Sequence, residues 1–90
     1  MCKAQLLVSN PSGLHLRPAG LFCEKAMEFQ SRVTFRYRGD NIGNAKSVLS
    51  ILGACIRSGD TIELICEGED EDEAYAAITD LIEGGFGEEI

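Results

Sequence analysis

The chain has 90 residues, of which 44% are apolar and 26% charged, so we expect one globular domain over residues 1–90. Its net charge of −7 argues against a nucleic-acid partner, because phosphate backbones require a basic surface. No apolar run approaches the length of a membrane span, and the first residues lack a signal-peptide core, so we expect a cytoplasmic protein without membrane insertion.

The first part of the chain alternates strand and helix patterns. Residues 4–9 alternate apolar and polar side chains, as a strand does, and the Asn-Pro-Ser-Gly sequence at 10–13 fits a type I turn. One helical face is indicated by apolar residues at positions 19, 22, 23, 26 and 27. Residues 32–38 alternate most clearly and predict a strand covered on one side, with its inward face formed by Val33, Phe35 and Tyr37.

The second part continues the alternation. A short strand is expected near residues 41–43, a short helix over 47–53 and a strand over 61–67. A second long helix is indicated by apolar residues at positions 74, 77, 78, 81 and 82. We expect the tail, at about 85–90, to be frayed. A one-faced sheet with helices on its apolar side predicts an α/β two-layer sandwich.

The cysteines offer little for a metal or disulfide. They lie at positions 2, 23, 55 and 66, with no CxxC pair, and the chain has a single histidine. This is a poor zinc ligand set, and no secretory signal accompanies it. We therefore expect reduced, mostly buried cysteines, with no metal and no other cofactor.

The single histidine, His15, lies at an expected helix start. Pro18 is tolerated only in the first turn of a helix, which places His15 at or beside the N-cap. Free backbone N–H groups and the guanidinium of Arg17 would stabilise an anion attached to the imidazole. Residues 1–46 carry seven Lys or Arg against three Asp or Glu, whereas residues 47–90 carry one against twelve. His15 is therefore a candidate phosphoryl acceptor; the alternative is a histidine that only caps the helix.

Several stretches resemble one known family. The sequence GLHLRPA at 13–19 resembles the active-site motif of the HPr family, the histidine-containing phosphocarriers of the bacterial phosphoenolpyruvate-dependent sugar phosphotransferase system. The sequence NAKS at 44–47, before an apolar helix, lies where this family has its second signature. SGD at 58–60 and EGED at 67–70 also match in kind and spacing, so the resemblance covers nearly the whole chain.

This resemblance carries expectations for fold and function. It implies an open-faced βαββαβα sandwich with a four-stranded antiparallel sheet, strand order 1-4-2-3, and three helices on one face. It implies a monomeric carrier, not an independent enzyme, whose His15 accepts a phosphoryl group on Nδ1 from phosphorylated enzyme I and donates it to enzyme IIA domains for sugar uptake. Arg17 is then the phosphate-stabilising residue. Carriers of a nitrogen-regulatory, dihydroxyacetone or fructose branch are the alternatives within the family.

A second switch and a docking surface are also expected. Ser47 matches the site that an HPr kinase/phosphorylase modifies in many Gram-positive relatives, which makes a catabolite-control regulator a further expected partner; a serine here also suits a helix N-cap. Gly20 should weaken the first helix by up to about 1 kcal/mol. Leu21 is expected on the side of the first helix opposite its core stripe. Apolar residues near His15 predict a partner surface that consists of Leu16, Gly20, Leu21, Val48, Leu49 and Leu52.

Overall fold

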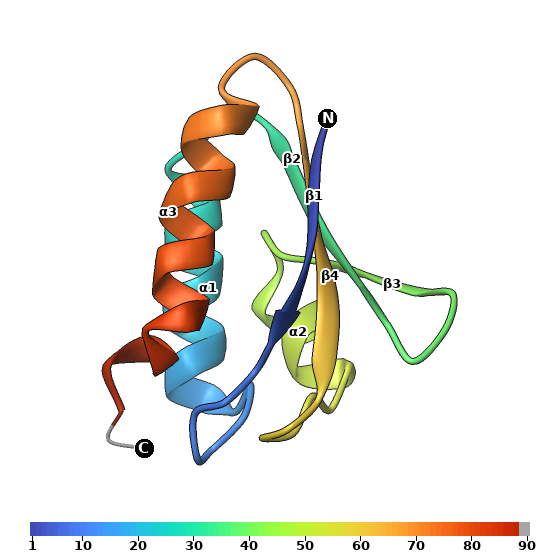
Figure 1. Cartoon of the computed structure of the whole chain (residues 1–90), viewed down its shortest axis with the longest axis vertical. Coiled ribbons are helices and arrows are strands. Elements are labelled where there is room, and N and C mark those ends of the chain that lie inside the picture. The colour runs from blue at the N-terminus through green and yellow to red at the C-terminus, as the bar shows by residue number, and fades with distance from the viewer. Residues whose placement is uncertain (89–90) are drawn as a thin grey trace.

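The computed structural model describes residues 1–88 and has the predicted order of elements (Figure 1). The first strand differs from its predicted range of 4–9, because its ends are set by pairing with a partner strand and not by its own alternation. The elements are β1 (Cys2–Leu7), α1 (Leu16–Met27), β2 (Arg32–Tyr37), β3 (Asn41–Asn44), α2 (Val48–Gly53), β4 (Thr61–Glu67), α3 (Glu71–Glu83) and a 3-10 turn, η1 (Gly85–Gly87).

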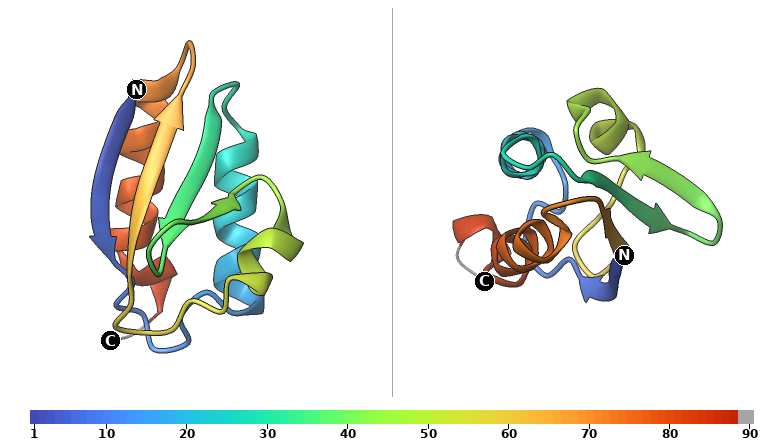
Figure 2. Two further views of the ribbon diagram at one scale, coloured as in Figure 1. Left: turned by 90° about the vertical axis from the view of Figure 1, so that its right-hand side faces the viewer. Right: turned by 90° about the horizontal axis from the view of Figure 1, so that it is seen from above.

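The four strands form one antiparallel sheet in the order β1-β4-β2-β3, which confirms the expected topology. β4 lies between β1 and β2, with Cys2 opposite Cys66 in one ladder and Arg32 opposite Glu67 in the other. The long helices α1 and α3 lie side by side over one face, and α2 contacts α1 and β3 (Figure 2). The other face of the sheet carries no helix within the described residues, so the sandwich is open-faced.

The core lies between the sheet and the helices. Phe22 of α1 and Phe35 of β2 are both fully buried, with ring centroids 5.7 Å apart. The inward face predicted for β2 is present, with Tyr37 half-buried beside the Phe35 ring. Met27 was expected in the apolar stripe of α1 but is 62% exposed, because it is the last residue of that helix.

The segment after α3 differs from the sequence-based expectation. The glycines at 85 and 87 have φ values of 66° and 77° and turn the chain back on itself, so that the Phe86 side chain is only 2% exposed. Glu88 then hydrogen bonds to Ser12. The prediction of a frayed tail is therefore wrong for residues 85–88; residues 89 and 90 lie outside the described residues. A single aromatic between glycines has no periodicity from which burial could be predicted.

All four cysteines are free thiols in the described part of the chain. Cys66 is buried and Cys2 and Cys23 are half-buried, but Cys55 is exposed, in the loop after α2 with a φ of 52°. The expectation of mostly buried cysteines thus fails at Cys55, since a loop position has no face turned to the core. Among the helices of residues 1–88, none has the length and apolar character needed to cross a membrane.

Candidate functional site

His15 is the N-cap residue of α1, as the position of Pro18 predicted. Its backbone is extended, with φ −81° and ψ −166°, and its carbonyl accepts a hydrogen bond from the N–H of Ala19 at 2.8 Å. The imidazole is exposed and makes no capping hydrogen bond within residues 1–88. His15 therefore begins the helix through its backbone, while the nitrogens of its imidazole remain available for chemistry.

Unpaired backbone donors lie in the first turn of the helix that His15 begins. In the first turn of a helix the N–H groups have no intrahelical partner, and Pro18 has none to offer. The N–H of Ala19 donates to the carbonyl of His15, so within residues 1–88 the donors of this turn that have no partner are those of Leu16 and Arg17. Together with the positive end of the helix, they form a local environment that favours negative charge.

The turn before His15 is held firmly in place. Asn10 is buried, and its side-chain amide donates to the carbonyl of Gly13 at 2.8 Å. Gly13 has a φ of 65°, and a Cβ at this position would lie 2.7 Å from the carbonyl oxygen of Ile56. The N–H of Leu14 donates to that same carbonyl at 3.0 Å. The turn is thus fastened to the loop between α2 and β4, which sets where His15 begins the helix.

His15 also borders a hollow of about 310 Å³. Only two of its six lining residues, His15 and Leu52, were predicted as site residues from the sequence. Among the others, Arg57 brings a second cationic residue to the surroundings of His15. The lining residues are Leu14, His15, Leu52, Cys55, Ile56 and Arg57.

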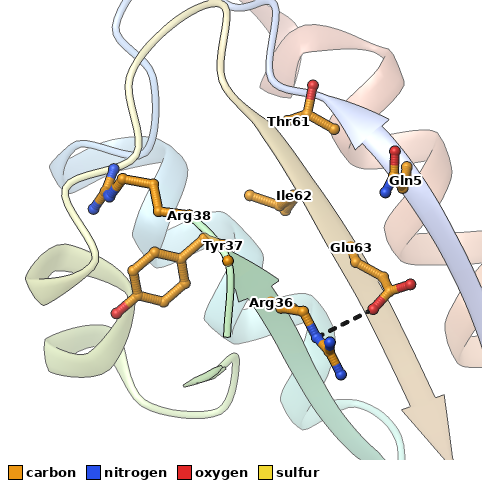
Figure 3. Close-up of a pocket in the computed structure, with 8 residues that line it drawn as sticks. Gln5, Arg36, Tyr37, Arg38, Thr61, Ile62 and Glu63 are labelled. Atoms are coloured by element: carbon orange, nitrogen blue, oxygen red, sulfur yellow. Dashed lines mark ion pairs between the residues drawn. The ribbon is translucent and has the colours of Figure 1, made fainter. Parts of the chain in front are cut away.

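A larger hollow of about 370 Å³ lies at the sheet and contains none of the predicted site residues (Figure 3). There Arg36 forms an ion pair with Glu63, with Nε and Oε1 3.4 Å apart, and Arg38 lies over the ring of Tyr37. These cations are therefore engaged with their own neighbours. Of these two hollows, the one beside His15 contains the predicted phosphoryl acceptor.

Arg17 is directed toward the C-terminal segment. The guanidinium Nη1 donates to the carbonyl of Phe86 at 3.4 Å. The pKa of Glu88 is lowered mainly by hydrogen bonds from Ser12 and Asn10, and to a smaller extent by the charge of Arg17. No hydrogen bond joins the guanidinium to His15 among residues 1–88. The two predicted residues thus share the start of α1, while the arginine is held by a segment that sequence reasoning left without a role.

Ser47 is the N-cap of α2, as its residue type predicted. Its backbone is extended, with φ −128° and ψ 114°, and its Oγ accepts a hydrogen bond from the N–H of Ser50 at 3.2 Å. Nearby, the Nζ of Lys46 donates to the carbonyl of Phe29 at 2.7 Å, which links the start of α2 to the end of α1. The NAKS stretch is therefore a structural junction as well as a candidate modification site.

The predicted partner surface is only partly exposed. Leu16 and Leu49 are 76% and 82% exposed, and Val48 is also exposed. Leu21 and Leu52, by contrast, are half-buried and pack against the core. The expectation that Leu21 lies opposite the core stripe is therefore wrong, because α2 and α3 both contact α1 and so bury more than one of its faces.

Gly20 occupies an open part of the predicted partner surface. Apart from its own helix, a Cβ at this position would meet no atom of the described chain within 4 Å. The helix backbone is thus accessible here to another molecule, while the cost of glycine to α1 remains.

Comparisons with known proteins agree with this geometry. The family model described as the PTS HPr component phosphorylation site matches residues 2–84. The HPr-like protein Crh of Halalkalibacterium halodurans is 41% identical over 83 residues, covering 92% of this chain and 98% of the relative. The phosphocarrier protein HPr of Neisseria meningitidis is 39% identical over 88 residues, covering 98% of each chain.

Solved structures show the same architecture. The crystal structure of HPr-C-His from Thermoanaerobacter tengcongensis is similar over 100% of both chains, with a TM-score of 0.95 and 39% identity. HPr from Bacillus anthracis is similar over 90% of this chain and 95% of that one, with a TM-score of 0.84 and 31% identity. The chain therefore belongs to the HPr family, the phosphocarriers of the phosphotransferase system.

Proposed function

We propose that this chain carries a phosphoryl group on Nδ1 of His15, accepted in the cytoplasm from phosphorylated enzyme I and donated to enzyme IIA domains for sugar uptake. The main support is the exposed imidazole of His15 at the N-cap of α1, which makes no capping hydrogen bond within residues 1–88. A histidine that served only as a cap would use a ring nitrogen for the helix. Here the chain acts as a monomer, and catalysis is left to its partners.

The transfer requires few groups from the carrier. The lone pair of the unprotonated Nδ1 of His15 forms a new bond to phosphorus while the phosphorus–nitrogen bond of the donor breaks. The electron pair of the broken bond stays on the donor nitrogen, and the proton of the His15 ring stays on Nε2. The product has about two negative charges on its phosphate oxygens. The free N–H groups of Leu16 and Arg17 and the Arg17 guanidinium are placed to offset that charge. Arg17 would leave a long, 3.4 Å hydrogen bond to do so.

The apolar residues beside His15 support a docking role. Leu16, Val48 and Leu49 are exposed around the start of α1 and α2, and we assign them to the surface that enzyme I and enzyme IIA domains contact. Leu21 and Leu52 are half-buried and pack against the core, so they contribute mainly by shaping that surface. Docking through one shared patch would let donor and acceptor use the carrier in turn.

Regulation through Ser47 is the second part of the proposal. Phosphorylation by an HPr kinase/phosphorylase would place about two negative charges at the N-terminus of α2, beside Val48 and Leu49. Phosphate oxygens can still accept from the N–H of Ser50, so the helix should persist. The new charge would oppose docking of enzyme I and create a surface for a catabolite-control regulator.

A dihydroxyacetone branch is the second candidate. The phosphoryl donor subunit DhaM of the PEP-dependent dihydroxyacetone kinase from Providencia stuartii is 37% identical over 86 residues, although the match covers only 18% of that protein. Offering phosphorylated carrier separately to enzyme IIA domains and to a dihydroxyacetone kinase would separate these branches. The sugar branch predicts loss of label to the IIA domains only.

The central experiment is phosphorylation with phosphoenolpyruvate and enzyme I. We expect acid-labile phosphate on His15, none on His15→Ala, and slow transfer in Arg17→Ala without loss of folding. Arg17→Lys should restore transfer poorly, because lysine lacks the planar fork of the guanidinium. Label that persists on His15→Ala would overturn the site.

The proposed switch has its own assay. Ser47→Asp should slow labelling of His15, though less than genuine phosphoserine, because aspartate carries less charge; Ser47→Thr is the matched control. The melting temperature of Ser47→Asp should remain close to that of the wild type. Equal labelling rates for unmodified and Ser47-phosphorylated protein would show that this serine is a helix cap only.

A further inference from the structure

The C-terminal segment, residues 85–88, contacts the chain on both sides of His15, at Ser12 before it and at Arg17 after it. It lies beyond residues 2–84, the range matched by the family model. Its anchor is the buried side chain of Phe86, whose carbonyl accepts the hydrogen bond from Arg17. Figure 1 shows this segment, the loop before α1 and the start of α1 gathered at one end of the molecule. The tail is therefore part of the surroundings of His15.

Glu88 closes this segment over the turn that leads to His15. Its Oε1 accepts hydrogen bonds from the N–H of Ser12 at 3.2 Å and from the side-chain amide of Asn10 at 3.1 Å. Its Oε2 accepts from the hydroxyl of Ser12 at 2.6 Å. Both carboxylate oxygens are thus bound by the turn at residues 10–13.

The charge of Glu88 is stabilised at this position. The hydrogen bonds from Ser12 and Asn10, together with the nearby charge of Arg17, lower the pKa of Glu88 from its ordinary value of 4.5. At neutral pH a carboxylate therefore accepts hydrogen bonds from Ser12, three residues before His15, and lies two residues after the carbonyl that Arg17 binds. The carboxylate of Glu88 is thus an anion of the chain itself, bound at the turn that precedes His15.

A second anion at His15 has to share these surroundings. The phosphoryl group adds about two negative charges close to Arg17, and like charges oppose each other. Any attraction that Arg17 gives to Glu88 in the free carrier is weakened when Arg17 turns to the phosphate. Both effects raise the free energy of the phosphorylated carrier relative to the free carrier.

We propose that Glu88 is a positioning residue, which holds the turn at residues 10–13 and shares Arg17 with the phosphoryl group, and thereby favours onward transfer from His15. The inference rests on the proposed function of His15. Because coupling between two sites is reciprocal, phosphorylation of His15 should in turn loosen Glu88 from Ser12.

Competition for one pool of phosphoryl groups tests this directly. Equal amounts of wild-type protein and Glu88→Gln are incubated with catalytic enzyme I and a limiting amount of phosphoenolpyruvate until the label stops redistributing. We expect the glutamine variant to hold about two to five times more label than the wild type, the size of a screened interaction between surface charges. Glu88→Asp, which keeps the charge, should share the label nearly equally with wild type.

The matched control is Glu73→Gln, which removes the same charge from an exposed position in the first turn of α3, at the opposite end of the molecule. It should share the label equally with wild type. Equal sharing by Glu88→Gln as well would overturn the proposal. So would a Ser12 amide signal, followed by NMR, that does not move on phosphorylation. Absence of label from every variant, or label on His15→Ala, would instead overturn the function proposed for His15.

Discussion

Replacing Phe86 by alanine is the sharpest test of the tail. The side chain is 2% exposed and belongs to the same buried cluster as the α3 residues Ile78 and Ile82. Truncating a buried phenylalanine to alanine costs about 3–5 kcal/mol, and a position at the end of the core supports the lower figure, about 3 kcal/mol. For a domain of this length that loss corresponds to a fall in melting temperature of about 12–24 °C.

The measurement is a pair of urea and thermal unfolding curves monitored by circular dichroism. Leu16→Ala is the control, because that leucine is 76% exposed and its loss should change the free energy of unfolding by less than about 0.5 kcal/mol. If Phe86→Ala is as stable as Leu16→Ala, the tail does not pack as described, and the expectation of a frayed segment was right.

Three further predictions concern the glycines, a carboxylate and the thiols. A Cβ on Gly43 would overlap the buried ring of Phe35, so Gly43→Ala should lose about 1–3 kcal/mol of stability in urea unfolding. Gly20→Ala, with open space around it, should gain up to about 1 kcal/mol, and equal effects of the two substitutions would contradict the packing. Hydrogen bonds from a serine hydroxyl and two backbone N–H groups lower the pKa of Asp70 from 3.8. The contribution of Asp70 to stability is therefore complete above pH 3.8 and disappears as the pH falls through the lowered pKa. The difference in melting temperature between wild type and Asp70→Asn should shrink from pH 6 to pH 3. Burial raises the pKa of the Cys66 thiol to about 11, so iodoacetamide at pH 8 should modify the exposed Cys55 first, and equal rates by mass spectrometry would argue against this burial.

The order of elements could be predicted because it depends on local pattern. The alternation at 32–38 and the four-residue spacing in α1 each report one buried face, and Pro18 limits where α1 can begin. His15 could be selected for the same reason, since its N-cap position follows from a proline three residues later. The order of strands in the sheet is not local, and it was available only through the resemblance to a known family.

The remaining features depend on contacts between distant residues. Glu88 binds Ser12 across 76 positions of the chain, and Arg17 binds the carbonyl of Phe86 across 69. Neither contact leaves a periodic signal at either end. Leu21 was placed on a free face because a helical stripe reveals only the main buried side, whereas α1 has two helical neighbours. Long-range packing therefore accounts for the incorrect parts of the prediction.

His15 and Ser47 occupy the same position on two different helices, yet their side chains are used in opposite ways. The hydroxyl of Ser47 accepts the N–H of Ser50 and so completes its helix, whereas the imidazole of His15 leaves the first N–H groups of α1 without a side-chain acceptor in the described chain. In the proposed phosphorylated carrier, the phosphate oxygens become that acceptor. Of these two N-cap residues, the proposed phosphoryl acceptor is the one that makes no side-chain cap in the described chain, and its phosphorylation would supply at α1 what the serine supplies at α2.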